Sequence, residues 1–93
     1  PGYVEAVAGQ AQRPTVDLSW EPVISARMAG YRVYRRQGEG AWRRLNPALV
    51  TVPAYQDANV VAGRSYTYRV TAVDVAGNES GPSGLAEETA PQP

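Results

Sequence analysis

The side chains with the clearest potential for chemistry are two carboxylates, Asp74 and Glu79, in the stretch VDVAGNES. Two carboxylates can hydrolyse a glycosidic bond, and together with Asn78 they could offer oxygen ligands to calcium. Both residues flank an expected Gly-Asn turn, however, where such side chains commonly cap backbone amides. Their spacing also differs from that of an EF-hand loop. We therefore expect a solvated turn, with neither a catalytic nor a metal site.

The composition removes most other catalytic chemistry. The chain has no His and no Cys, and its nine basic residues are all Arg. A serine triad, a thiol nucleophile, a lysine base and a zinc–thiolate site each need one of the missing residue types. The lack of Cys also excludes disulfides. The sequence thus predicts a protein that is not an enzyme and that needs no cofactor.

A group of arginine and aromatic residues is the best candidate for contact with a ligand. These residues should point outward from neighbouring strands, with Arg43 or Arg44 beside them: Arg32, Tyr34, Arg36, Trp42 and Arg69. Arg and aromatic side chains together can stack on sugars or pair with carboxylates and sulfates. Alternatively, long Arg stems cover the rings on a solvated face, and cross-strand Glu residues balance the charge. We favour this alternative, because exposed sheet faces are normally polar.

Alternating patterns predict the strands that carry these residues. Between Arg64 and Asp74 every second residue lies on one apolar face, as is typical of a half-buried strand: Tyr66, Tyr68, Val70 and Ala72. Similar patterns, bounded by turns that contain Gly, Pro or Asn, predict six more strands. They are Tyr3–Val7, Thr15–Trp20, Gly30–Arg36, Ala41–Leu45, Ala54–Asp57 and Leu85–Thr89.

The connections and the core follow from the same patterns. Gly9–Pro14 is polar, Asn46–Pro53 reads as an irregular edge or loop, and Asp57-Ala58-Asn59 as an Asx-type turn. Seven short strands without helical periodicity favour an all-β sandwich. Its core would hold Trp20, Tyr31, Val33, Tyr66, Tyr68 and Val70, between two sheets about 10 Å apart.

Several motifs together resemble the fibronectin type III domain across essentially the whole chain. They are LSWEP at Leu18–Pro22, GYRVYRR at Gly30–Arg36 and AGRSYTYRVTAVDVAGNES at Ala62–Ser80, followed by SGPS. The resemblance implies a seven-stranded antiparallel immunoglobulin-like β-sandwich with a three-stranded and a four-stranded sheet. It makes Tyr66 the tyrosine of a tyrosine corner, whose hydroxyl should bond to the backbone near Val60–Ala62.

Charge and hydropathy limit the partners. A net charge of zero argues against nucleic-acid binding across the whole surface. No apolar run approaches the roughly 20 residues that span a bilayer, so we expect no membrane insertion. Neither an Arg-Gly-Asp triplet nor a WSxWS box is present. We expect a monomer whose partners are neighbouring domains of the same chain, with a polysaccharide or a protein as a further candidate.

The resemblance implies a non-catalytic spacer or interaction module of a larger secreted or cell-surface protein, in an extracellular or cell-envelope location. The domain would span residues 1–89, and residues 90–93, with two prolines, would form a linker. One alternative is a carbohydrate- or protein-binding module that uses the Arg/Tyr face or loops at one end. These loops are Glu21–Ala29, Gly38–Gly40 or its neighbours, and Asp74–Gly81. Another is an accessory domain packed on a catalytic neighbour, which would leave an exposed apolar patch.

Overall fold

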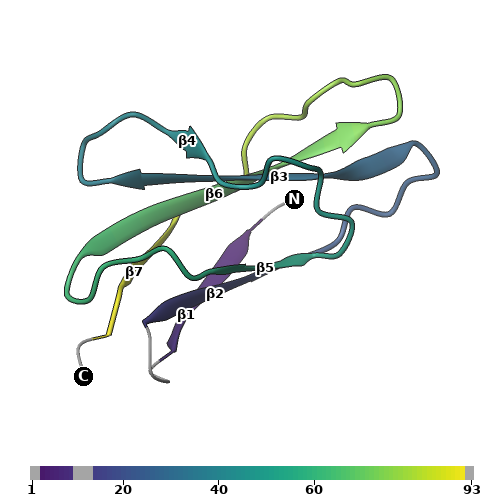
Figure 1. Cartoon of the computed structure of the whole chain (residues 1–93). Helices are drawn as coiled ribbons and strands as arrows, with labels where there is room; N and C mark the ends of the chain where they lie inside the picture. The colour runs from purple at the N-terminus through teal and green to yellow at the C-terminus, as the bar shows by residue number, and fades with distance from the viewer. Residues whose placement is uncertain (1–2, 10–13, 92–93) are drawn as a thin grey trace.

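The computed structural model describes residues 3–9 and 14–91, which form two antiparallel β-sheets packed face to face (Figure 1). One sheet has the order β1-β2-β5 and the other β4-β3-β6-β7. This arrangement confirms the predicted immunoglobulin-like sandwich of three plus four strands. The strands are β1 Val4–Gly9, β2 Thr15–Trp20, β3 Met28–Gln37, β4 Arg43–Arg44, β5 Ala54–Asp57, β6 Ser65–Asp74 and β7 Ala86–Thr89.

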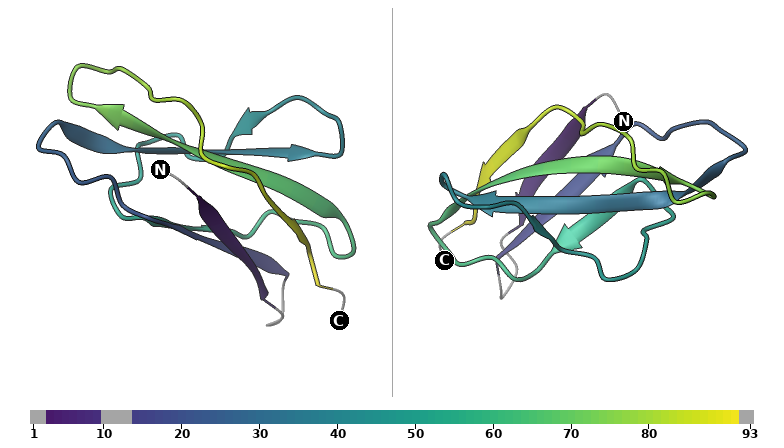
Figure 2. Two further views of the ribbon diagram at one scale, coloured as in Figure 1. Left: turned by 180° about the vertical axis from the view of Figure 1, so that it is seen from behind. Right: turned by 90° about the horizontal axis from the view of Figure 1, so that it is seen from above.

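Views from behind and from above show the two layers crossing at an angle (Figure 2). Such an angle arises from the twist of each sheet. The long strands β3 and β6 form the centre of the larger layer. In the described ranges we find no helix of the length and hydropathy that a membrane span requires.

The predicted bounds are right for β2 and β5 and differ at the ends of the other strands. β3 extends from Met28 to Gln37 because its partner β6 continues pairing past a bulge between Met28 and Gly30. β4 contains two residues rather than the predicted five, because only Arg43 and Arg44 pair with β3. Residues 10–13, within the predicted polar connection, lie outside the described residues.

The core consists of aromatic and aliphatic side chains from both sheets. All six predicted core residues are buried: Trp20, Tyr31, Val33, Tyr66, Tyr68 and Val70. The rings of Trp20 and Tyr31 meet edge to face, with centroids 5.2 Å apart, a geometry that aromatic pairs prefer. The Tyr31 hydroxyl accepts a hydrogen bond from the backbone N–H of Val23 at 2.9 Å. This contact ties the loop after β2 to the core.

The connection between β5 and β6 is held by the predicted tyrosine corner. The Tyr66 hydroxyl accepts a hydrogen bond from the backbone N–H of Val61 at 2.8 Å, which confirms the expected partner region. Gly63 has φ 83°, in the left-handed region that favours glycine. The connection thus combines a fixed turn with a side-chain anchor.

A buried polar network, not predicted from the sequence, lies at the same end of the molecule. Asp57 is 2% exposed and accepts hydrogen bonds from Arg35 at 2.9 and 3.2 Å and from the Tyr68 hydroxyl at 2.8 Å. The Asp57 carboxylate also accepts from the backbone N–H of Asn59 at 3.1 Å, which confirms the predicted Asx-type turn. The Arg35 guanidinium lies 4.9 Å from the centre of the Tyr66 ring. Because a buried charge needs both a counter-charge and hydrogen bonds, these residues satisfy one another.

Side-chain hydrogen bonds also organise the irregular segment Asn46–Pro53. The buried Asn46 amide donates to the carbonyls of Tyr31 and Ala48, both at 2.9 Å. Its oxygen accepts from the backbone N–H of Val33 at 2.8 Å. Val50 then forms a short bridge with Tyr31. The segment is irregular, as predicted, but it is fixed against the edge of β3.

The chain segment before β7 follows β6 without regular pairing. The Ser83 hydroxyl accepts from the backbone N–H of Val70, and the Ser80 hydroxyl from that of Ala72, each at 2.9 Å. Pro82 has no N–H to offer a ladder. Ser80 and Ser83 also donate their backbone N–H groups to the carbonyls of Ala72 and Val70 at 2.7 and 2.8 Å, so isolated backbone bonds and side-chain bonds together hold this segment against β6. β7 accordingly begins at Ala86.

The chain stays attached to the sandwich beyond the end of β7. Ala90, which we assigned to the linker, is 1% exposed, and its backbone bonds to Arg64 and Gly63 at 2.9 Å. Ala90 therefore packs as part of the sandwich. Of the remaining predicted linker, residues 92–93 lie outside the described residues.

Candidate ligand-binding face

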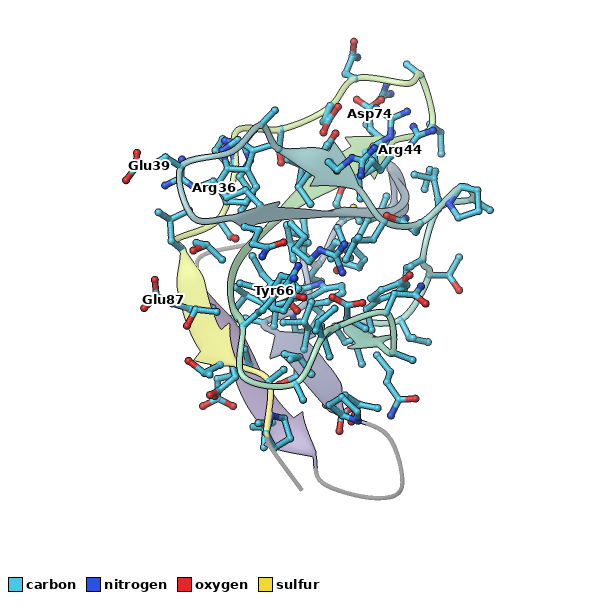
Figure 3. The ribbon with its side chains drawn as sticks, turned by 60° about the vertical axis from the view of Figure 1, so that its left-hand side comes forward. Arg36, Glu39, Arg44, Tyr66, Asp74 and Glu87 are labelled. Carbon is cyan, nitrogen blue, oxygen red and sulfur yellow. The ribbon has the colours of Figure 1, made fainter. Side chains whose placement is uncertain are left out.

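The candidate site is the outer face of the four-stranded sheet, where β3 and β6 are neighbours. The register places Tyr34 opposite both Arg69 and Arg44, and Arg36 opposite Thr67. Directly paired residues share a face of the sheet, so these side chains point outward together. In Figure 3, Arg36 and Arg44 lie on the outer side of this sheet, whereas Tyr66 lies between the sheets.

Two guanidinium groups and two rings form a stack across this face. The guanidinium carbon of Arg36 lies 4.9 Å from the centre of the Trp42 ring, and that of Arg69 lies 4.4 Å from the same ring. Arg69 also lies 5.5 Å from the centre of the Tyr34 ring. These distances fall within the range of cation–π attraction. We call Arg36, Trp42, Arg69 and Tyr34 the Arg–aromatic stack.

Glu79 neutralises the other side of the face. Its carboxylate accepts hydrogen bonds from Arg32 at 2.8 Å, from the Thr71 hydroxyl at 2.6 Å and from the Tyr34 hydroxyl. The hydrogen bond from the Thr71 hydroxyl contributes most to holding the pKa of Glu79 below its ordinary value. The hydrogen bond from Tyr34 comes next, and that from Arg32 has a smaller effect. Glu79 is therefore ionised at neutral pH, and Arg32 is occupied by an intramolecular ion pair.

The same contacts shift the pKa values of the two donors. Burial, and then the hydrogen bond to Glu79, raise the pKa of Tyr34, while the hydrogen bond to Glu79 raises the pKa of Arg32.

Because the folded pKa of Glu79 is depressed, the contribution of Glu79 to stability is present above its ordinary pKa of about 4.3. That contribution is lost as the pH falls through the folded value.

Asp74 has a different role from Glu79. Its carboxylate accepts hydrogen bonds from the backbone N–H groups of Ala76 and Asn78, each at 2.9 Å, and from the Asn78 amide at 3.1 Å. The bonds from Asn78 lower the pKa of Asp74. Asp74 is the last residue of β6 and caps the loop that follows, as the sequence predicts (Figure 3). Among the described residues, no three His, Cys, Asp or Glu side chains come together as metal ligands would.

Two of the three predicted loops meet at one end of the sandwich. The backbone N–H of Val75, in Asp74–Gly81, donates to the carbonyl of Arg27, in Glu21–Ala29, at 2.7 Å. A cavity of about 250 Å³ lies between these loops, lined by Val23 and Met28 among others.

The third loop, Gly38–Gly40, lies elsewhere. β3 runs without interruption from Met28 to Gln37, so Gly38–Gly40 is at the opposite end of that strand (Figure 1). Its prediction as part of the same loop cluster was wrong. The segment that joins the cluster instead includes Thr51 and Pro53, which line a second cavity together with Val23 and Met28.

The comparisons with known proteins agree with this architecture. The sequence profile of the fibronectin type III domain matches residues 1–89. The chain belongs to the fibronectin type III family. A solved Fn3-like protein from Clostridium thermocellum shares 26% identity with this domain at a TM-score of 0.71, covering 94% of this chain and 90% of that one.

Curated relatives of this fibronectin type III domain are much longer chains. The domain is 39% identical over 86 residues to an amylopullulanase from Thermoanaerobacterium thermosulfurigenes, covering 92% of this chain but 4% of that enzyme. It is 37% identical over 75 residues to a poly(3-hydroxybutyrate) depolymerase from Ralstonia pickettii, covering 81% of this chain and 14% of that enzyme. The domain thus corresponds to a module within large multidomain proteins.

The basic face of the fibronectin type III domain could be located from the sequence, and the structure identifies Glu79 as the acid that balances Arg32. The five predicted contact residues do lie on one face: Arg32, Tyr34, Arg36, Trp42 and Arg69. The counter-charge of Arg32 comes from Glu79, which follows β6 and forms an isolated antiparallel bridge with Val73 of that strand. The position of Glu79 could have been inferred from the sequence, because a chain that turns at Gly77-Asn78 returns beside β6. There the backbone N–H of Ser80 donates to the carbonyl of Ala72.

Proposed function

We propose that this domain is a non-catalytic module of a larger secreted or cell-surface chain, in which it separates and orients neighbouring domains. The proposal rests on the closed form of the domain, a sandwich of 43 × 26 × 22 Å. The carboxylates of Asp57, Asp74 and Glu79 are all engaged in structural contacts within it. The relatives support it, because in them the matching region is a small part of a long enzyme. Enzymes that break down large polymers commonly act outside the cell, since their substrates cannot enter it.

The path of the chain supports a separating role. β1 begins at Val4, opposite Trp20, and β7 ends at Thr89, opposite Ser65. In Figure 1, β1 and β7 run in the same direction along one edge of the sandwich. The chain therefore enters β1 at one end of this edge and leaves β7 at the other. Domains joined at these points would be held apart by about the length of β1, roughly 20 Å for its six residues.

Exposed apolar side chains support contact with a neighbouring domain at the end where β1 begins. Ile24 is 91% exposed and Val75 is 65% exposed, on the two loops that the Val75–Arg27 hydrogen bond joins. Trp20, the partner of Val4, directly precedes the first of these loops. A domain joined before β1 would thus lie beside Ile24, and burial of such surface is favourable by about 25 cal/mol per Å².

Deletion of residues 4–90 from the full-length protein tests this function. We expect the activity of the other domains on a small soluble substrate to stay unchanged, since this module contributes no reactive group. The largest dimension in small-angle scattering should fall, by up to the 43 Å length of the domain. A variant in which a Gly/Ser linker replaces the domain is the control, because it keeps the connection but removes the fixed separation.

The contrary result is also clear. Loss of activity on the small substrate, while the remaining domains stay folded by circular dichroism, would show that this domain takes part in catalysis. An unchanged scattering dimension would contradict the separating role.

A further inference from the structure

We propose that Arg36, Trp42 and Arg69 of the Arg–aromatic stack bind a carboxylate-bearing polysaccharide. This inference rests on the proposed function as a non-catalytic module and adds a class of ligand to it. In the part of the chain that the structure describes, the ion pairs are Arg32–Glu79 and Arg35–Asp57. Arg36 and Arg69 have no carboxylate within ion-pair distance there. The face therefore presents two cations whose charge is not balanced by a direct contact.

The two guanidinium groups are held in place before any ligand arrives. Each lies within 5 Å of the Trp42 ring centre, and the Nε–H of each is buried without a hydrogen-bond partner. The terminal N–H groups are consequently the donors that a ligand can use. The planar guanidinium matches a carboxylate with two parallel hydrogen bonds, and side chains that are already ordered lose less entropy on binding.

The occupied tryptophan ring favours an anion over a neutral sugar. Neutral sugars bind to aromatic side chains by stacking on a free ring face, but two guanidinium groups already cover Trp42. Tyr34 is likewise covered by Arg69 and has its hydroxyl engaged by Glu79. The stack therefore offers charge and hydrogen-bond donors rather than an open aromatic platform.

The spread of charge favours a chain with repeated anionic groups over a single anion. Both guanidinium groups flank one ring, and exposed Arg44 adds a third positive charge on the same face, opposite Tyr34. Two acids, Glu39 and Glu87, lie at this edge (Figure 3). Glu39 is on the connection after β3, and Glu87, on β7, lies opposite Thr67 of β6. Neither forms an ion pair with Arg36 or Arg69 among the described residues. An extended polysaccharide with a carboxylate on successive sugars can reach several of these cations at once.

Binding of polygalacturonate to the 93-residue chain, measured by affinity electrophoresis and calorimetry at low ionic strength, tests the proposal. We expect binding that weakens as salt approaches about 0.15 M, because salt screens exposed charges. Neutral amylopectin should not bind. The double variant R36Q/R69Q should lose at least about tenfold in affinity, the effect of one lost charge-assisted hydrogen bond.

The matched control is R27Q/R64Q, which removes the same charge from two exposed arginines outside the stack. It should bind polygalacturonate like the original chain. Equal losses in both double variants would overturn the proposal, because only net charge would then matter. Absence of binding at low ionic strength, or tighter binding to polyglutamate than to polygalacturonate, would also overturn it, the latter in favour of an acidic protein partner.

A second measurement does not depend on any variant folding correctly. Polygalacturonate should change the fluorescence of half-buried Trp42 in the original chain, since the two guanidinium groups on its ring engage the ligand. Binding without a fluorescence change would place the ligand elsewhere and overturn the proposal. Failure of these tests leaves the deletion experiment on the module function unaffected, so the two proposals can fail separately.

Discussion

Tyr66 and Tyr68 show how a single hydroxyl group can fix a segment of the fold. Both rings are buried, so each hydroxyl must find a partner within the protein. Tyr66 accepts a hydrogen bond from the N–H of Val61, and Tyr68 donates to the carboxylate of Asp57. Burial, and next the Asp57 hydrogen bond, raise the pKa of Tyr68, so this hydroxyl stays a donor throughout the physiological pH range.

Replacement of Tyr66 by Phe should destabilise the domain by about 1 kcal/mol, because the N–H of Val61 loses its acceptor. Tyr55→Phe is the matched control, since the hydrogen bond from the Tyr55 hydroxyl to the Leu45 carbonyl is 3.5 Å long. A bond of that length contributes little. Urea unfolding of both variants measures the difference, and equal destabilisation would contradict the role of the corner.

Single residues also mark the limit of prediction from the sequence. Tyr66 could be assigned a partner because the backbone N–H that donates to its hydroxyl, that of Val61, is close in the chain. Arg35 could not, since its carboxylate partner Asp57 is 22 positions away and approaches only when the two sheets pack. On an alternating strand the inward position of Arg35 predicts an apolar contact, and only the packed structure shows the counter-charge.

At the scale of elements, the edge of β3 is held against an irregular segment rather than a long partner strand. Tyr31 pairs with Val50 through two backbone hydrogen bonds of 2.8 and 3.1 Å. Gly30 lies directly beneath this crossing, where an added Cβ would lie 2.7 Å from the Leu49 Cβ and 3.0 Å from the Val50 carbonyl oxygen. The close approach of the two backbones requires glycine at this position.

Gly30→Ala should therefore cost about 1–3 kcal/mol, the usual effect of overpacking in a buried site. The matched control is Gly81→Ala, where an added Cβ would have open space; its effect should stay within about 0.5 kcal/mol. Thermal unfolding of the two variants gives the comparison. Similar melting temperatures for both would mean that the 46–53 segment moves away from β3 easily.

The elements were predictable where side-chain alternation alone determines them. β2 and β5 have their predicted bounds because alternation ends at a turn signal on each side. The length of β4 depends instead on how far Arg43 and Arg44 stay in register with β3, which no local pattern reports. The role of Asn46 is hidden for the same reason, because two of its three hydrogen bonds reach Tyr31 and Val33 on β3, and the third stays within the segment, at Ala48.

For the whole molecule, a net charge of zero hides an uneven distribution. The outer face of the four-stranded sheet carries Arg36, Arg44 and Arg69 beside the neutralised Arg32–Glu79 pair. On the other sheet, Glu5 and Asp17 are exposed and pair with Ser19 and Val7, so they share its outer face. The two broad surfaces of the domain therefore differ in sign, and composition alone could not indicate this.

The account as a whole depends on the domain being a self-contained unit, closed around Trp20 and the buried tyrosines. The most direct test is urea unfolding of the 93-residue chain, followed in parallel by tryptophan fluorescence and by far-ultraviolet circular dichroism. Because Trp20 is 5% exposed, we predict one cooperative transition with the same midpoint for both probes. Two separate midpoints, or no transition at all, would show that the sandwich needs a neighbour to fold and would contradict an independent module.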